Sequence, residues 1–301
     1  RLIVKAADKK LLKYGTVESN YGDVYTVTFD SADETKLGYA YYKEKAEDAY
    51  IDGAVLSADN KEVTSSDASD ELPLEKLETA VEDSGKTYPN TVALIDTGVA
   101  DGTDHIKEYL SVLDSDGYDD NGHGTNMANH ILSMNPDADI ISIKALGSNG
   151  AGTSVSIYAA IELAIEKKVS IINLSLYAPV NEKNTLVEEA INDAVNAGIT
   201  VVGAAGNKGE DAANYIPGRM DKPIIVGACD ENGKRLKTSN YGDTVDYMVV
   251  ASATSEAAAI MTGFLSAGIK IEDFLNKDII YSTDYEKPEE IVNAFADLDY
   301  N

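Results

Sequence analysis

The sequence predicts an α/β protein in which a mostly parallel sheet carries helices on both faces, preceded by a small α+β domain. Two observations support this prediction. From residue 91 onward, short apolar segments alternate with amphipathic ones, which is typical of strands and covering helices around a parallel sheet. Residues 1–64 instead follow the order strand, helix, strand, strand, helix, strand, which indicates a ferredoxin-like sandwich. We therefore expect an N-terminal domain at 1–64, a linker at 65–88 and a large domain at 89–301.

Local signals predict the elements of the N-terminal domain. Residues 1–6 (RLIVKA) form an apolar strand, and residues 8–15 (DKKLLKYG) a short helix ending at a glycine, which favours the left-handed cap conformation. Alternating side chains over 16–30 predict a hairpin. A capping box that begins at Ser31 starts the second helix. Residues 49–59 (AYIDGAVLSAD) predict the fourth strand.

The remaining chain divides into a polar segment and the large domain. Residues 60–88 are mostly polar, with one short helix expected at 74–81. Five apolar segments then predict the strands of the large sheet: 91–96, 138–146, 169–176, 198–205 and 222–228. Apolar residues at helical spacing predict helices at 154–168 and 184–198, and a further helix that begins at His123. In such folds the functional loops lie at the carboxyl ends of the strands.

Composition excludes several classes of function. The 52 acidic residues exceed the 25 basic ones, which leaves a formal charge of −27. This charge repels nucleic acids and anionic membranes, so neither is expected as a partner. No apolar run approaches the ~20 residues of a membrane span. Cys229 is the only cysteine, which excludes an internal disulfide, and its apolar surroundings predict a buried thiol without catalytic function.

Four polar residues occur where the predicted strands end or helices begin. Asp96 ends the segment TVALID, Asn207 follows TVVGAAG, and His123 lies between two glycines at the start of a helix. Ser255 stands at the start of an alanine-rich helix. Taken singly, each has an ordinary alternative: Asp and Asn are common in turns, the histidine can simply end a helix, and Ser is among the best N-cap residues.

Taken together, the four residues fit one chemistry. A serine hydroxyl becomes a nucleophile when an imidazole accepts its proton, and a carboxylate holds that imidazole in the required tautomer. A side-chain amide such as that of Asn207 can donate to the oxyanion that forms on the attacked carbonyl. The chain order Asp96, His123, Ser255 is one of the known orders of such a triad.

The segments ALIDTGV, NGHGT, INLSL, VVGAAGN and ATSEAAA resemble, in order and spacing, those of the subtilisin-like serine proteases over roughly residues 89–300. The resemblance implies a serine endopeptidase in which Asp96 orients His123, His123 is the base, Ser255 the nucleophile and Asn207 the oxyanion donor. It also implies two backbone edges that bind an extended substrate, and a floor of the primary specificity pocket near Asn214. The edge residues are Gly150, Ala151, Gly152, Ser175, Leu176 and Tyr177.

Residues 1–64 resemble the inhibitory propeptide of the same family. This resemblance implies a zymogen that cuts itself around Val63–Ser66, with the propeptide acting as an intramolecular inhibitor and proteins or peptides as the other partners. The chain begins at Arg1, which suggests a processed product. The family also implies a secreted or cell-surface protein of bacterial origin.

The chain departs from the family pattern around the serine. Ala253 and Ala259 replace a glycine and a proline, Glu256 follows the nucleophile, and a longer loop before the serine is missing. Tyr177 stands where a glycine is usual and is expected to crowd the substrate edge. These departures keep an alternative open, namely a catalytically impaired binding or scaffold protein with the same fold.

The sequence indicates no required cofactor. His105 and His130 are expected to be structural or solvated, and no spacing of His, Cys and Glu suggests zinc. The acidic run at 114–122 has a composition that suits calcium, but the sequence shows no clear site there.

Overall fold

The structure is a computed structural model that describes residues 1–22, 24–46, 48–51, 54–58, 88, 90–180, 185–273 and 280–282. The expected helix at 74–81 and the expected cleavage region at Val63–Ser66 lie outside these residues.

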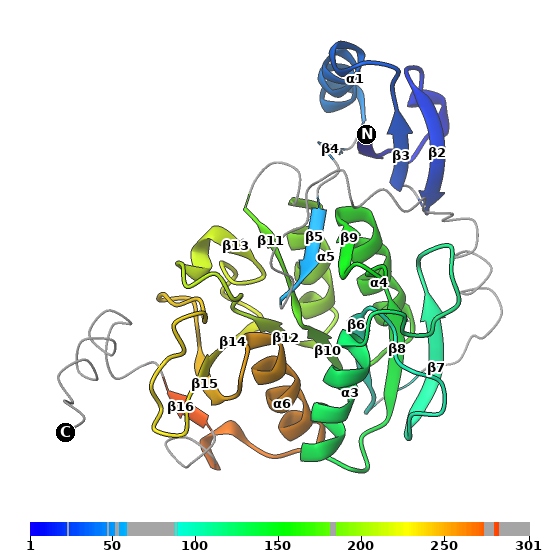
Figure 1. Ribbon diagram of the computed structural model, residues 1–301. Coiled ribbons are helices and arrows are strands. Elements are labelled where there is room, and N and C mark those ends of the chain that lie inside the picture. The colour runs from blue at the N-terminus through cyan, green and yellow to red at the C-terminus, as the bar shows by residue number, and fades with distance from the viewer. Residues whose placement is uncertain are drawn as a thin grey trace.

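An eight-stranded sheet forms the centre of the large domain, in the order β16-β15-β14-β12-β10-β6-β8-β7 (Figure 1). Neighbouring strands from β15 to β7 are parallel, and only the pairing of β16 with β15 is antiparallel. The predicted α/β class is therefore confirmed. In chain order the strands are β6 (Val92–Asp96), β7 (Ile106–Ser111), β8 (Ile140–Lys144), β10 (Ile171–Leu174), β12 (Thr200–Ala204), β14 (Ile224–Cys229), β15 (Tyr247–Val250) and β16 (Ile280–Ser282).

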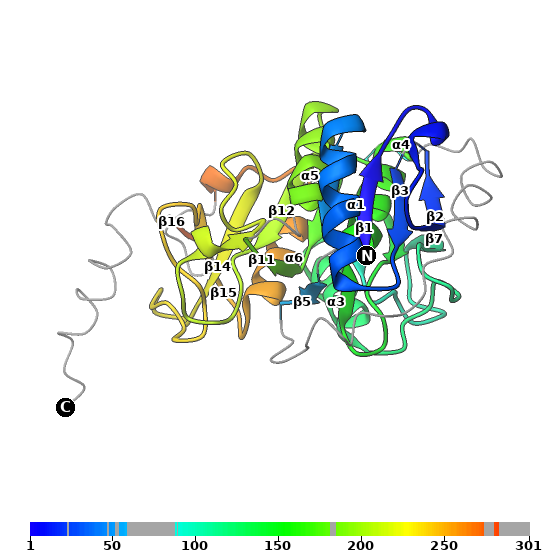
Figure 2. The same ribbon diagram turned by 90° about the horizontal axis from the view of Figure 1, so that it is seen from above.

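Helices cover both faces of this sheet (Figures 1 and 2). Alternate residues of β6 point to opposite sides: Ala93 and Ile95 belong to the apolar cluster with α4 (Ser154–Glu166) and α5 (Thr185–Asn196). Val92 and Leu94 belong to the cluster with α3 (His123–Met134) and α6 (Thr254–Ser266). All five residues of β6 are buried, which is why this strand is continuously apolar up to its final aspartate.

The N-terminal unit, by which we mean residues 1–58, contains a four-stranded antiparallel sheet in the order β2-β3-β1-β4. Its elements are β1 (Leu2–Lys5), η1 (Lys9–Leu11), β2 (Thr16–Tyr21), β3 (Val24–Thr28), α1 (Ala32–Lys45) and β4 (Asp48–Ile51). Ser31 caps α1 as predicted, its hydroxyl accepting from the Glu34 N–H at 3.2 Å. The helix predicted at 8–15 is instead the single 3-10 turn η1, capped by Asp8.

The sheet of the N-terminal unit packs on α4 and α5. Leu2 and Val4 point toward the core of the unit itself, whereas Ile3 belongs to the apolar cluster that includes both helices of the large domain. Lys5 Nζ forms an ion pair with Glu189 Oε1 of α5 at 2.7 Å. Seen from above, the unit lies over α4 and α5 (Figure 2).

The strand predicted at 49–59 is two strands in two different sheets. β4 completes the sheet of the N-terminal unit, whereas β5 (Ala54–Ser57) leaves it and enters a small second sheet of the large domain. That sheet has the order β13-β11-β5-β9, formed with β9 (Ala151–Thr153), β11 (Leu176–Pro179) and β13 (Tyr215–Ile216). Two further 3-10 turns are η2 (Ala212–Asn214) and η3 (Ile271–Asp273).

Candidate active site

The carboxyl end of β6 positions Asp96 against the first residue of α3. Asp96 is fully buried, and its Oδ1 lies 2.7 Å from Nδ1 of His123 and accepts the Thr97 N–H at 2.7 Å. Gly124 makes this approach possible, because a Cβ there would lie 2.0 Å from the carbonyl oxygen of Gly98. The pair can therefore hold a histidine in one tautomer and present its other ring nitrogen for proton transfer.

The loop before His123 is fixed by Asp119. Its carboxylate accepts backbone N–H groups from Asn121, Gly122 and Thr125 at 2.8–3.0 Å, together with the hydroxyls of Thr97 and Thr125. Burial alone would raise the pKa of Asp119, but these hydrogen bonds outweigh burial and lower the pKa below its ordinary value. The loop is thus held by an ionised carboxylate.

Lys144, at the end of β8, supports the same loop from beneath. Its side chain is buried, and Nζ donates to the carbonyl oxygen of Thr97 at 2.7 Å and to Asp120 Oδ1 at 2.6 Å. Because Thr97 directly follows Asp96, the lysine fixes the chain where it leaves the strand. The sequence placed this lysine in a strand but gave no sign of this contact.

Ser255 is the second residue of α6 and is fully buried. The N-cap of this helix is Ala253, so the alternative that Ser255 serves as the helix cap is wrong. Helices α6 and α3 cross closely, since a Cβ on Gly263 would lie 2.7 Å from the Ile131 carbonyl oxygen. The crossing packs the helix that carries Ser255 directly against the helix that begins at His123.

Asn207 follows β12, and both atoms of its amide are engaged. Its Oδ1 accepts the Thr254 N–H at 3.1 Å, which fixes the side chain beside the start of α6. Its Nδ2 donates to the carbonyl oxygen of Ala58 at 2.9 Å. Asn207 therefore already binds a peptide carbonyl, and that carbonyl belongs to the N-terminal unit.

The two predicted backbone edges enclose this segment of the N-terminal unit. β5 lies antiparallel to both β9 and β11, and Leu56 is opposite Ala151 on one side and Tyr177 on the other. The Ser57 N–H donates to the Gly150 carbonyl at 2.8 Å, and the Ala58 N–H to the Ser175 carbonyl at 2.9 Å. The edges thus bind an extended peptide by adding it as a strand.

The turn before Ser255 is short and is stabilised by a side chain. β15 ends at Val250 and α6 begins at Thr254. Glu256 reaches back across this turn: its Oε2 accepts the Ser252 N–H at 3.0 Å and also the Ser252 hydroxyl. Its other oxygen lies 3.8 Å from Nδ1 of His130, on α3.

A buried polar chain links α6 to β10, and the sequence did not reveal it. The Thr262 hydroxyl donates to Asn173 Oδ1 at 2.9 Å, and Asn173 Nδ2 donates to the Ser175 hydroxyl at 2.9 Å. Ser175 then donates to the Ser255 carbonyl at 3.0 Å. All four residues are buried, so this chain fixes the start of α6 relative to the substrate edge.

Asn214 lies at the end of η2 with its residue surface exposed. Its neighbour Tyr215 is the residue that faces the substrate edge: the rings of Tyr215 and Tyr177 are 5.3 Å apart in an edge-to-face arrangement.

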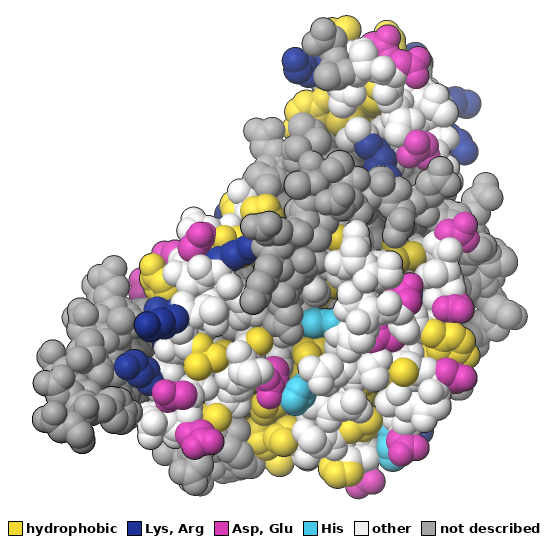
Figure 3. Space-filling view, viewed as in Figure 1, with side chains coloured by type: hydrophobic (Ala, Val, Ile, Leu, Met, Phe, Trp, Pro, Cys, Tyr) yellow, Lys and Arg dark blue, Asp and Glu magenta, His cyan; other side chains and the backbone are white. Residues whose placement is uncertain are grey.

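Other candidate groups do not form a second site. Cys229 is fully buried, and burial together with Asp230 raises the pKa of its thiol to about 12. Within the described ranges, no group of three or more His, Cys, Asp or Glu residues could hold a metal ion. Acidic side chains are scattered over the face shown in Figure 3 rather than gathered in one patch. No helix among the described residues is long and apolar enough to cross a membrane.

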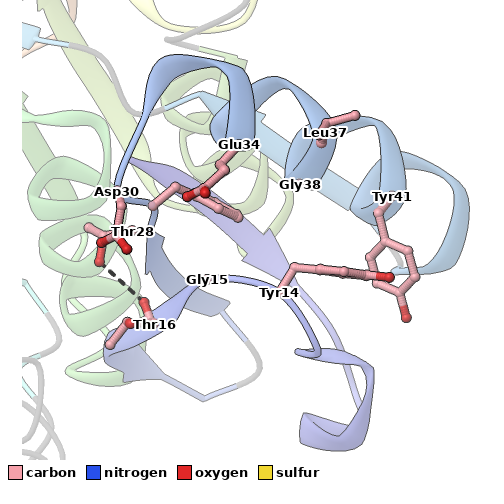
Figure 4. Close-up of a pocket in the computed structure, with 10 residues that line it drawn as sticks. Tyr14, Gly15, Thr16, Thr28, Asp30, Glu34, Leu37, Gly38 and Tyr41 are labelled. Carbon is pink, nitrogen blue, oxygen red and sulfur yellow. Dashed lines mark hydrogen bonds between the residues drawn. The ribbon is translucent and has the colours of Figure 1, made fainter.

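The N-terminal unit also contains a groove of about 540 Å³ between its hairpin and α1 (Figure 4). The rings of Tyr14 and Tyr41 lie at one end, with centroids 4.8 Å apart, and Asp30 and Glu34 lie at the other. Neither a histidine nor a serine lines it, so the groove does not offer the acid-base chemistry found around Asp96 and His123.

Comparison with known proteins shows the family to which this chain belongs. The model of the subtilase family of peptidases matches residues 89–279. The thermostable alkaline protease of Halalkalibacterium halodurans is 39% identical over 167 residues, which cover 52% of this chain and 45% of that protein. Subtilisin DY of Bacillus licheniformis is 33% identical over 193 residues, covering 59% of this chain and 70% of that protein.

A solved structure shares the fold. It is the crystal structure of a cold adapted subtilisin-like serine proteinase, with a TM-score of 0.56 and 22% identity, covering 69% of this chain and 80% of that one. The alignment with the thermostable alkaline protease spans less than half of that relative's length.

Proposed function

Because this chain belongs to the subtilase family, we propose that it is a serine endopeptidase that cuts peptide bonds through Asp96, His123 and Ser255. The Ser255 hydroxyl attacks the carbonyl carbon, and its proton passes to Nε2 of His123. Asp96 Oδ1, 2.7 Å from Nδ1, stabilises the imidazolium that forms. Asn207 Nδ2 donates to the oxyanion.

The rest of the cycle uses the same groups. His123 returns its proton to the leaving amine, which departs and leaves an acyl-enzyme on Ser255. Water then attacks the ester, with His123 again as base, and releases the acid and free Ser255. Nucleophile, base and oxyanion donor are all side chains of this chain, so the proposal requires no cofactor.

One observation carries the proposal: the Ala58 carbonyl accepts a hydrogen bond from the Asn207 amide while β5 pairs with both substrate edges. This is the placement that a residue on the acyl side of a cut bond requires, because the attacked carbonyl must reach the oxyanion donor. We therefore place the self-cleavage between Ala58 and Asp59. This site is upstream of the Val63–Ser66 region that the sequence suggested.

We further propose that the N-terminal unit inhibits the enzyme. It fills the cleft with its own strand and packs Ile3 of β1 into the apolar cluster around α4 and α5. Substrates are then proteins or peptides that replace β5 as the added strand. The curated relatives come from bacteria, and we expect this protein to act outside a bacterial cell.

N-terminal sequencing and mass spectrometry of three purified proteins test this function: the native chain, Ser255→Ala, and Ser266→Ala as a matched change at the far end of the same helix. We expect cleavage after Ala58 in the native chain and in Ser266→Ala, and an intact Ser255→Ala chain. Equal cleavage of all three would mean that another protease makes the cut.

A fluorophosphonate probe separates the enzyme from the alternative binding or scaffold protein. The processed native protein is expected to be labelled and Ser255→Ala to remain unlabelled. The departures at Ala253, Glu256 and the short turn motivate the alternative. A folded native chain that neither cuts itself nor takes the label would establish the alternative.

A further inference from the structure

The side chain of Ala58 and the ring of Tyr177 lie on the same side of the second sheet. Ser57 is opposite Leu176 and Leu56 is opposite Tyr177, so Ala58 falls opposite Ser175, whose carbonyl accepts its N–H. Side chains alternate along a strand, and Tyr177 is therefore the diagonal neighbour of Ala58 on one face. An aromatic side chain reaches across such a diagonal.

The Tyr177 ring fills the space beside Ala58. Only 2% of Tyr177 is exposed, and its Cγ would lie 4.0 Å from a Cβ built on Gly206. Gly206 directly precedes Asn207, the donor to the Ala58 carbonyl. The ring thus lies between the edge that binds the peptide and the segment that carries the oxyanion donor.

Tyr215 closes the same space from behind. Its ring packs edge-to-face against Tyr177 with centroids 5.3 Å apart, and its hydroxyl donates to Glu210 Oε2 at 2.6 Å. Burial, with a further contribution from Glu210, raises the pKa of both phenols. Both rings remain neutral, and Tyr215 is anchored, so neither is expected to leave for solvent readily.

The side chain of Ala58 is enclosed by the protein. The residue is 1% exposed and belongs to the same buried apolar cluster as Tyr177 and Ala204, against which the partly buried Tyr215 packs. Its backbone is fixed on both sides, at Ser175 and at Asn207. A larger side chain could enter only by displacing the Tyr177 ring from a packed interior, which is costly.

We infer that Tyr177, with Tyr215 behind it, determines specificity by restricting the residue on the acyl side of the cut bond to alanine, glycine or serine. This inference rests on the proposed endopeptidase function. The resemblance implied a pocket floor near Asn214, which is polar but uncharged. We infer instead an apolar pocket that the ring of Tyr177 almost fills. The substrate class is therefore polypeptides with a small residue before the cut.

Self-cleavage of the full chain tests the inference directly. Ala58→Gly and Ala58→Ser add little or no bulk and are expected to be processed within about threefold of the native rate. Ala58→Leu is expected to be processed more than tenfold slower, because one or a few methylenes in a tight pocket change rates by ~10–200-fold. Rates are followed by gel and mass spectrometry after refolding.

A second substitution protects the test against misfolding. Tyr177→Gly opens the space, so Ala58→Leu combined with Tyr177→Gly is expected to be processed at least tenfold faster than Ala58→Leu alone. Tyr215→Phe keeps the ring and is a matched control that leaves Ala58→Leu slow. If Tyr177→Gly restores processing of Ala58→Leu and Tyr215→Phe does not, pocket volume, and not loss of folding, limits the cut.

Processed native enzyme should show the same preference on peptides that differ only before the cut, with alanine cleaved more than tenfold better than leucine or phenylalanine in kcat/KM. If the native chain is processed and Ala58→Leu is processed equally fast, the inference fails and the proposed function stands. If the native chain is not processed and takes no fluorophosphonate label, the proposed function itself fails.

Discussion

Around His123, the preceding loop is held by several hydrogen bonds to one carboxylate, whereas around Ser255 the support is divided among several side chains that each make one or two hydrogen bonds. Asp119 gathers the loop before the histidine, and Lys144 fixes the chain after Asp96. Beside Ser255, Glu256 accepts the Ser252 N–H across the short turn, and the Ser175 hydroxyl donates to the Ser255 carbonyl. The comparison teaches that one part of the site depends on a single carboxylate, whereas the other part divides its support among side chains from different elements.

The largest effect is expected when one of the proposed catalytic residues is changed. Asp96→Asn should lower the rate of self-cleavage by ~10⁴-fold, because an amide at this position favours the wrong histidine tautomer. Stability should change little, since the Thr97 N–H still finds an acceptor. The exposed Asp104→Asn is the matched control, and a rate near that of the native chain for Asp96→Asn would remove Asp96 from the proposed mechanism.

Asp119→Asn should produce the next largest effect, on rate and on stability together. The loss of charge-assisted hydrogen bonds is expected to cost ~1–3 kcal/mol of unfolding free energy and about 10²-fold in self-cleavage. Because the pKa of Asp119 is lowered in the folded chain, its contribution is present above the ordinary carboxyl pKa of 3.8 and is lost as pH falls below it.

Denaturant unfolding at neutral pH and at acid pH, in the uncleavable Ser255→Ala background, measures this contribution. The difference between Asp119→Asn and its parent should shrink in acid. Asp116→Asn, which changes the acceptor of one 3.3 Å hydrogen bond from the Tyr118 N–H to an amide oxygen, should cost less at either pH. A difference that grows in acid would contradict an ionised Asp119.

Changes on the serine side should be smaller. Glu256→Ala is expected to slow self-cleavage about tenfold by releasing the turn at Ser252. Glu256→Gln retains one acceptor oxygen and should slow self-cleavage about threefold. Hydrogen bonds to a charged group are worth ~1.5–3 kcal/mol, and this contribution is lost here only in part. Glu272→Ala, in an exposed turn, is the control. Rates unchanged by Glu256→Ala would show that the short turn does not need this side chain.

The smallest effect concerns the surface between the two units, where carboxylates are crowded. The pKa of Glu162 is raised to about 7, mainly by burial and also by Asp193, Glu166 and Glu189, while Lys5 opposes the rise. If removal of the N-terminal unit returns this pKa toward 4.5, the assembled form binds more protons between these values. Raising the pH across this range should therefore weaken the assembly.

Gel filtration of the processed protein at pH 5 and pH 8 measures retention of the cut unit. We expect about tenfold weaker retention at pH 8, and loss of this pH dependence in Glu162→Gln but not in the exposed Glu166→Gln. Retention that strengthens as pH rises would contradict the proton linkage.

Much of the fold and of the candidate site could be predicted because strand ends carry strong local signals. Asp96 is the one polar residue of a buried strand, and Gly124, directly after His123, lies where a Cβ would clash with the Gly98 carbonyl oxygen. β7 was missed because it is an edge strand with mostly half-exposed side chains, so its composition reads as a loop. Alternation over 49–59 likewise cannot show that a chain changes sheets between β4 and β5.

The contacts that depend on tertiary structure could not be predicted. Thr262 is 89 residues from Asn173 in the sequence, and the two meet only through the packing of α6 on β10. Tyr177 was recognised as a departure that crowds the substrate edge, but its contact with the partly buried ring of Tyr215 was not expected. The two residues are far apart in sequence, and local pattern does not show which side chains an irregular loop brings together.

The path of the chain around the cleft has a kinetic consequence. After Ala58 the chain is next described at Tyr88, whose N–H donates to the Lys167 carbonyl at 2.7 Å just beyond the end of α4. Residues 59–87 join the two points, and a chain of that length can span up to ~100 Å when extended. Both ends can therefore stay in place while one molecule cuts itself.

The proposed self-cleavage is therefore expected to be first order in protein, with a half-life that does not change on dilution. Until it occurs, the tether holds β5 at an effective concentration in the millimolar range, which external peptides must exceed to compete. Once the bond is broken, dilution acts on the complex for the first time. In this proposal, the 29 residues between Ala58 and Tyr88 make inhibition intramolecular until the cut. After the cut, inhibition depends on the concentrations of two separate molecules.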